Sequence, residues 1–167
     1  DADKANEDLR HYCMENSLNL IYEGTMRGTQ VFLEIAKEFR QAGYEIDLRL
    51  MAVSKLESYG STFLRYATDL LHNNQPRWIS QEIHDESYEK FIFTLKQFVD
   101  QSLFDDAKVY KRGKEDNGRP IQIYSTKGHE FTDPIEAILY GRETSRREAI
   151  EDYELKHKFV CEILEKR

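Results

Sequence analysis

The apolar positions along the chain predict helices that alternate with short strands. Hydrophobic side chains recur at helical spacing after Thr29, and Gly43 stands where a glycine commonly ends a helix. Short apolar runs predict buried strands at residues 18–22, 46–53 and 107–110, with a further strand at 121–124 that pairs nearby. This alternation is typical of an α/β protein.

Local sequence marks the ends of several helices. Residues 54–57 read Ser-Lys-Leu-Glu, the capping-box pattern in which both polar side chains bond to backbone N–H groups at a helix start. The breaker at residues 73–76 ends that helix, and Ser80 begins the next. Residues 144–167 predict a long amphipathic C-terminal helix. We therefore predict one α/β domain with a largely parallel sheet flanked by helices, because parallel strands need helical crossovers.

The composition narrows the class of protein. The chain has 167 residues, of which 40% are hydrophobic, so it can bury the core of one domain. Its net charge of -7 offers no broad basic face, which predicts no nucleic-acid partner. No apolar stretch approaches the roughly 18 residues of a membrane helix, so we expect no membrane partner. Cys13, Cys161 and the scattered histidines lack metal or redox spacing, which predicts a cytoplasmic protein without a metal site of its own.

A candidate binding turn follows the first predicted strand. Ligands of parallel sheets gather at the carboxyl ends of the strands. Glu23, Thr25 and Arg27 place a carboxylate, a hydroxyl and a guanidinium there, a set suited to a phosphorylated, polyhydroxylated ligand. The alternative is a structural turn in which Thr25 caps the next helix and Glu23 pairs with Arg27. On spacing alone, this alternative is the commoner outcome.

Two arginines flank the breaker between the central helices. Arg65 and Arg77 resemble in placement the arginines of mobile lids that cover the γ-phosphate in phosphoryl-transfer enzymes. The alternative is that each is a solvated surface charge, which is the usual state of an arginine on a helix. Asp85, which follows His84 near a predicted helix start, needs no catalytic explanation because the helix dipole favours an anion there.

Three segments in a fixed order resemble the zeta-toxin family of bacterial toxin–antitoxin kinases. They are NLIYEGTMR at 19–27, AGYEIDLRLMAVSKLESYGST at 42–62, and the Arg65-Tyr66 pair. The resemblance extends over roughly residues 5–126. It implies a P-loop kinase scaffold that uses ATP and Mg2+ to phosphorylate a sugar nucleotide such as UDP-N-acetylglucosamine, and it implies an antitoxin partner.

The same resemblance implies roles for the candidate residues. Glu23 and Thr25 would contact substrate, with Arg27 close by. Arg77 matches a lid arginine that neutralises the transferring phosphate, and Arg65 would assist it or hold the lid. Around Arg77, however, the sequence PRWISQ differs from the family's ARATP-like motif.

The phosphate-binding loop of such kinases does not occur in this sequence. No GxxxxGK[ST] motif is present, and the family's loop and its catalytic aspartate are expected upstream of Asp1. Residues 1–167 are therefore predicted to be a partial zeta-toxin-like kinase domain. We expect this segment alone to lack kinase turnover, with ATP and Mg2+ bound mainly by the N-terminal portion.

Two other functions remain open at the level of sequence. A P-loop kinase with a different small-molecule acceptor shares this architecture, because a fold does not fix a substrate. A non-catalytic module that acts by binding an antitoxin-like partner is the other alternative, since the phosphate-cradling loop is missing from these residues.

Overall fold

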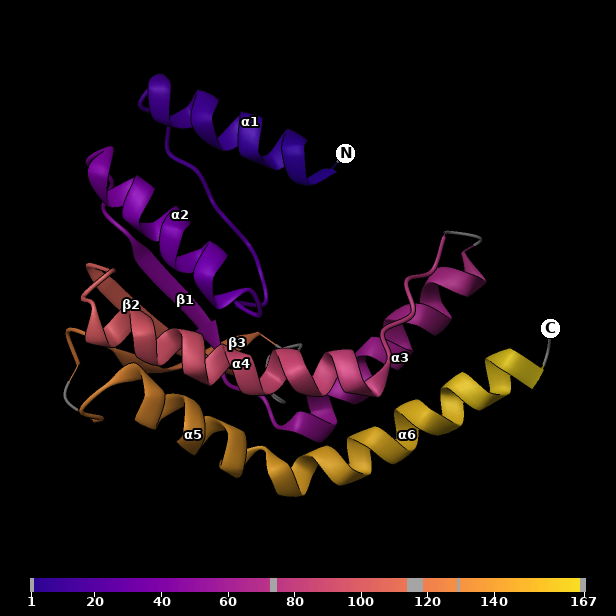
Figure 1. The fold of residues 1–167 in the computed structure, drawn as a ribbon. Coiled ribbons are helices and arrows are strands. Elements are labelled where there is room, and N and C mark those ends of the chain that lie inside the picture. The colour runs from indigo at the N-terminus through magenta and orange to yellow at the C-terminus, as the bar shows by residue number, and fades with distance from the viewer. Residues whose placement is uncertain (1, 73–74, 114–118, 129, 166–167) are drawn as a thin grey trace.

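The computed structural model describes residues 2–72, 75–113, 119–128 and 130–165 (Figure 1). In chain order its elements are α1 (Ala2–Glu15), α2 (Thr29–Gln41), β1 (Asp47–Met51), α3 (Lys55–Leu71), α4 (Gln81–Asp100), β2 (Asp106–Arg112), β3 (Pro120–Ser125), α5 (Pro134–Thr144) and α6 (Arg146–Glu165). The predicted α/β class is confirmed, and so is the long C-terminal helix.

The sheet is small and mixed. β1 pairs in parallel with β2, in the register Leu50↔Val109, and α3 and α4 form the crossover between them. β3 pairs antiparallel with β2, with an irregularity between Val109 and Tyr110. The connection at residues 113–119 is too short for a helical crossover, so this last strand returns as a hairpin. Parallel pairing was thus correctly expected for β1 and β2, and the expectation of a largely parallel sheet does not extend to β3.

The core covers one face of the sheet. Leu50, Ala107 and Val109 are buried and pack against Leu95 of α4 and Ile138 of α5. The alternate positions carry polar side chains and ion pairs, including those of Asp47 with Arg49 and with Lys108. This alternation indicates a sheet with one buried face and one solvated face.

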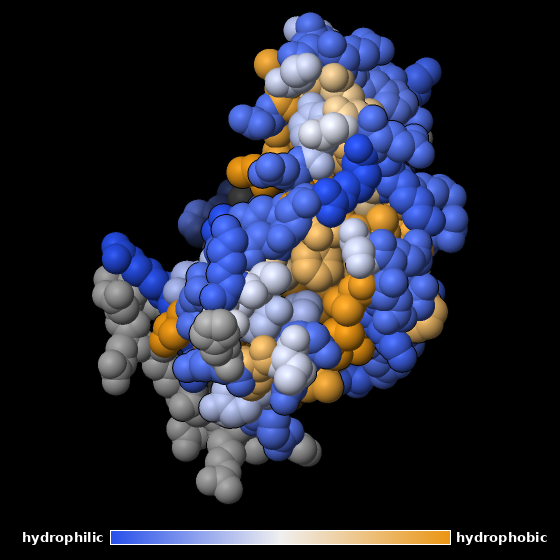
Figure 2. Space-filling model, turned by 90° about the vertical axis from the view of Figure 1, so that its left-hand side faces the viewer, coloured by the Kyte–Doolittle hydropathy of each residue, from blue (hydrophilic) through white to orange (hydrophobic). Residues whose placement is uncertain are grey.

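The predicted strand at residues 18–22 is wrong. The segment is irregular, and Ile21 is 91% exposed. A strand needs a neighbour for its backbone N–H and C=O groups, and no strand of the described ranges pairs with it. Tyr22 instead packs edge-on against Phe32 of α2, with ring centroids 5.9 Å apart. Figure 2 shows the side of the molecule that lies on the left in Figure 1; this side is mostly hydrophilic, with apolar side chains gathered near its middle.

The predicted helix starts at residues 54 and 80 are confirmed. The Ser54 hydroxyl accepts a hydrogen bond from the Glu57 backbone N–H, and Ser80 caps α4 in the same way. α3 and α6 extend away from the sheet side by side (Figure 1), held by a small apolar cluster that includes Ala67 and Val160. Within the described ranges, no helix has the length and apolar character needed to cross a membrane.

Candidate functional site

The turn that follows residues 18–22 is fixed to α4 by a buried threonine. Thr94 is fully buried, and its hydroxyl donates to the Met26 carbonyl at 2.7 Å. The same hydroxyl lies 2.7 Å from the Thr29 hydroxyl at the start of α2. Met26 adopts a left-handed backbone conformation (φ 56°) and buries its side chain. The backbone of this turn is therefore held by the hydrogen bond from Thr94 of α4 and by the buried side chain of Met26.

The three candidate binding residues of this turn are exposed to solvent. α2 begins after Gly28 without a side-chain cap, so Thr25 does not cap that helix. Arg27 pairs with Glu86 of α4 at 3.9 Å, and Glu23 has no ion pair with any described residue. Both parts of the structural alternative are thus absent from the described turn. Glu23, Thr25 and Arg27 present their side chains on a fixed backbone.

Gly24 gives this turn its close approach to α2. A Cβ atom built on Gly24 would lie 2.4 Å from Cζ of Phe32. Such a separation is far below van der Waals contact, so a side chain at this position would displace either the ring or the turn. The glycine between Glu23 and Thr25 therefore serves packing, in addition to any role in ligand binding.

Replacing Thr94 by valine should loosen this turn at little cost in volume. The substitution removes the donor to the Met26 carbonyl and leaves that acceptor unsatisfied, which costs about 1–2 kcal/mol. We expect the free energy of unfolding, measured with urea, to fall by that amount. Thr144→Val is the matched control, because Thr144 is exposed and bonds only within its own helix. Equal losses for the two variants would contradict the anchoring role of Thr94.

The two candidate lid arginines lie on the arm formed by α3 and the segment before α4. Arg65 lies on α3, and Arg77 lies three positions before the Ser80 cap. Both are exposed, and neither forms an ion pair with a described residue. Trp78 packs edge-on against Phe63 and Tyr66 of α3, with centroids 5.3 Å apart in each case. This aromatic contact ties the segment that carries Arg77 to α3.

The two candidate groups meet the same part of α4 without touching each other. Arg27 contacts Glu86 in the N-terminal half of α4, and Arg77 precedes the first residue of that helix. No hydrogen bond or ion pair between described residues joins Arg77 to the turn at 23–27. The turn at 23–27 and Arg77 therefore both lie beside the N-terminal half of α4, without a direct contact between them among the described residues.

A buried histidine joins α3 and α4 at the base of this arm. His84 is 7% exposed, and its Nε2 lies 3.0 Å from the Ser58 hydroxyl. Its Nδ1 lies 3.1 Å from the Asp85 carboxylate, which also pairs with Lys55 at 3.0 Å. The hydrogen bond from His84, followed by that from Lys55, lowers the pKa of Asp85. Sequence reasoning noted His84 and Asp85 but missed Ser58, which lies 26 positions away and carries no local signal.

This Ser–His–Asp arrangement does not form an acyl-transfer site. Such a site needs backbone N–H donors directed at a developing oxyanion. Ser58 lies inside helix α3, where its own N–H donates to the Ser54 carbonyl at 2.9 Å. The cluster instead fixes the packing of α4 on α3, because each polar atom of the buried His84 ring has a partner.

The residues present do not fit a complete site for ATP and magnesium. The sequence has no GxxxxGK[ST] motif to cradle the phosphates. In the described part of the chain, no three His, Cys, Asp or Glu side chains gather so as to hold a metal ion. The described surface thus offers exposed cations and the polar turn at 23–27, and the sequence lacks the motif of a nucleotide-binding loop.

Comparison with known proteins finds toxins of streptococci among the relatives of this chain. The chain is 29% identical to the toxin PezT of Streptococcus pneumoniae over 151 residues, which cover 89% of this chain and 56% of that protein. It is 32% identical to the toxin zeta of Streptococcus pyogenes over 127 residues, which cover 74% of this chain and 42% of that protein. The chain therefore spans about half the length of the curated relatives it matches.

The fold and the family model agree with these relatives. A structure solved in a study of the PezAT chromosomal toxin-antitoxin system of Streptococcus pneumoniae superimposes with a TM-score of 0.74. The superposition covers 96% of this chain and 62% of that one at 22% sequence identity, so it shows a shared fold. The model of the zeta toxin family matches residues 1–128, which is most of the sequence. The chain belongs to the zeta toxin family.

Proposed function

We propose that these residues are the acceptor-binding and lid portion of an ATP-dependent kinase of the zeta-toxin type. Its substrate is a sugar nucleotide such as UDP-N-acetylglucosamine. The observation that carries the proposal is the turn at residues 23–27, whose backbone is fixed by Thr94 while Glu23 and Thr25 remain exposed. A rigid backbone with free polar side chains is what orientation of a hydroxyl acceptor requires.

In this proposal the side chains of the turn bind different groups of the substrate. Glu23 accepts hydrogen bonds from the sugar hydroxyls, and Thr25 both donates and accepts. Arg27, the last residue of the turn, would pair with phosphate oxygens of the sugar nucleotide. Arg77 would neutralise the charge of the transferring phosphate, and Arg65 would assist it or hold the lid. Stabilisation of that charge is the main protein contribution to phosphoryl transfer.

The proposal assigns the nucleotide-binding loop and the catalytic aspartate to residues upstream of Asp1. Residues 1–167 are then a partial kinase domain, because they supply no loop for the ATP phosphates. In the complete protein, bound Mg2+·ATP would supply the phosphoryl group. We expect the 167-residue chain alone to show no kinase turnover.

The test is phosphorylation of UDP-N-acetylglucosamine by the complete parent protein with ATP and magnesium, followed by mass spectrometry. We expect the sugar nucleotide to gain one phosphate, and Glu23→Gln to lower the rate at least tenfold because a carboxylate acceptor is lost. Glu34→Gln is the matched control, since Glu34 is an exposed glutamate of α2 that bonds only to Gln30. A folded, ATP-binding parent that gives no product would point to another acceptor.

The proposal includes an antitoxin partner and a cytoplasmic location. The structurally similar chain comes from a study of the PezAT chromosomal toxin-antitoxin system, which supports the partner. Cys13 and Cys161 are both free thiols, as expected in a reducing compartment. Co-purification of the parent with the product of a neighbouring gene would test the partner.

A further inference from the structure

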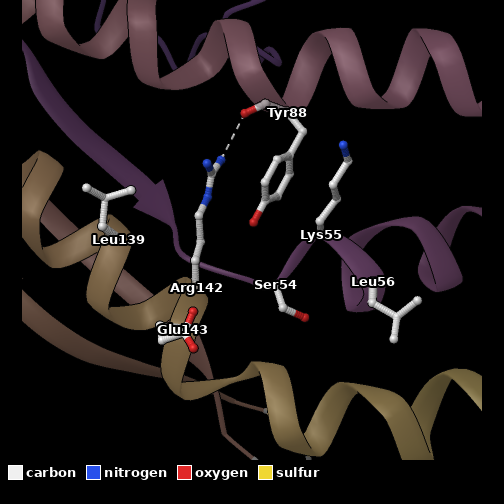
Figure 3. Close-up of a pocket in the computed structure, with 7 residues that line it drawn as sticks. All are labelled: Ser54, Lys55, Leu56, Tyr88, Leu139, Arg142 and Glu143. Carbon is white, nitrogen blue, oxygen red and sulfur yellow. Dashed lines mark hydrogen bonds between the residues drawn. The ribbon is translucent and has the colours of Figure 1, made fainter.

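A cavity of about 510 Å3 lies where α3, α4 and α5 meet (Figure 3). Ser54 and Lys55 line it from the start of α3, Tyr88 from α4, and Leu139 and Arg142 from α5. This volume exceeds that of a phosphate ion and falls within the range of small-molecule sites. The candidate turn and the lid arginines contribute none of the lining residues.

Arg142 is the unusual side chain of this cavity. Its guanidinium stacks on the Tyr88 ring, 3.6 Å from the ring centroid, and Nη2 donates to the Tyr88 carbonyl at 3.1 Å. Its Nε atom is buried and has no hydrogen-bond partner among the described residues. No carboxylate of the described chain pairs with Arg142, and burial lowers its pKa. A largely buried arginine normally has an anionic partner, because isolated charge is costly to bury.

The surroundings of Arg142 favour an anion that comes from outside the chain. The Tyr88 ring holds the guanidinium by a cation–π contact, and the Tyr88 hydroxyl donates to the Val53 carbonyl, so the ring itself is fixed. Lys55 adds a second cation at the rim, although it also pairs with Asp85 and Glu89. The N-terminal end of α3 contributes a partial positive charge. Glu143 is the acidic residue among the lining side chains.

We propose that this cavity binds the phosphate group of a small phosphorylated metabolite, with Arg142 as its principal ligand-binding cation. The fork of guanidinium donors suits phosphate oxygens, which a point charge serves less well. Leu56 and Leu139 give the organic part of the ligand apolar walls. The inference needs neither the turn at 23–27 nor ATP, so it stands apart from the proposed kinase function.

Titration of the wild-type chain tests the site without any substitution. The Arg142 Nε–H resonance is followed by NMR while glycerol 3-phosphate, inorganic phosphate or acetate is added at constant ionic strength. We expect a saturable shift with glycerol 3-phosphate, a smaller saturable shift with inorganic phosphate, and none with acetate. Saturation by inorganic phosphate alone would assign the site to the free ion and overturn the metabolite proposal. An unmoved or non-saturating resonance would overturn the site altogether.

Two variants separate charge from geometry. Arg142→Met should weaken glycerol 3-phosphate binding at least tenfold, and Arg142→Lys severalfold, because lysine keeps the charge but loses the fork. The methionine variant should stay folded, since replacing a buried charge by an apolar chain is often neutral or stabilising. Arg119→Met, at an exposed position beside β3, is the matched control and should bind normally. Wild-type affinity in Arg142→Met would refute the assignment.

Discussion

Replacing Arg77 by alanine in the complete parent protein is expected, on the proposed function, to lower the rate of phosphoryl transfer by about a thousandfold, the usual effect of losing an arginine that contacts the transferring phosphate. Arg77 is exposed, unpaired with described residues, and carried by a segment that Trp78 ties to α3. The stability of the fold should be unchanged, because the Arg77 guanidinium forms no hydrogen bond or ion pair with the described residues. The loss should therefore appear in kcat with little change in the melting temperature. The measurement is steady-state phosphorylation of UDP-N-acetylglucosamine by the parent protein.

Two further variants make the Arg77 result specific. Arg65→Ala should cost less, because Arg65 is proposed to assist or to hold the lid. Arg119→Ala removes an equally exposed arginine on the β2–β3 hairpin and should leave the rate intact. Near-normal turnover in Arg77→Ala would remove this residue from the proposed mechanism, while leaving the acceptor assay and the role of Glu23 to stand on their own tests.

The helices were predictable because their signals are local. Ser54 and Ser80 cap the next helix through atoms three positions away, and Gly43 adopts the left-handed conformation that ends a helix (φ 83°). The run at 18–22 shows the limit of such signals. Its composition is that of a buried strand, but strand formation depends on a neighbouring chain that composition does not reveal.

The candidate turn was identified through a rule about strand ends, although no strand precedes it in the structure. The backbone of this turn is anchored instead by the contact of Thr94 with Met26, which joins residues 68 positions apart. The His84–Ser58 and Arg142–Tyr88 contacts likewise join α3, α4 and α5 across 26 and 54 positions. A single sequence indicates which residues have suitable chemistry, but only the packing of these helices decides which of them meet.

A glycine sets how closely α5 approaches the sheet, and its replacement is expected to destabilise the fold strongly. An alanine in a helix interior usually stabilises by about 1 kcal/mol relative to glycine. At Gly141 the added Cβ would lie 2.5 Å from Cβ of Ala52 and 2.9 Å from Cδ1 of Ile123. Overpacking of this kind costs about 1–3 kcal/mol and reverses the sign of the substitution. The net loss is then up to about 2 kcal/mol, so we expect Gly141→Ala to lower the melting temperature by up to about 8 °C, at about 2–4 °C per kcal/mol for a chain of this size.

The reciprocal substitution tests whether this contact is the cause. Ala52 is fully buried next to the start of α3, so Ala52→Gly alone should also destabilise, by about 1 kcal/mol. Combined with Gly141→Ala it removes the nearest clashing atom and leaves only the mobile end of Ile123 to adjust. The double variant should therefore lose less free energy of unfolding, measured with urea, than the two single variants lose together. If the two losses of stability simply add, α5 accommodates the Cβ of residue 141 by moving away from Ala52. If the double variant loses less than their sum, Gly141 sets the position of α5, and with it that of Arg142, against the end of β1.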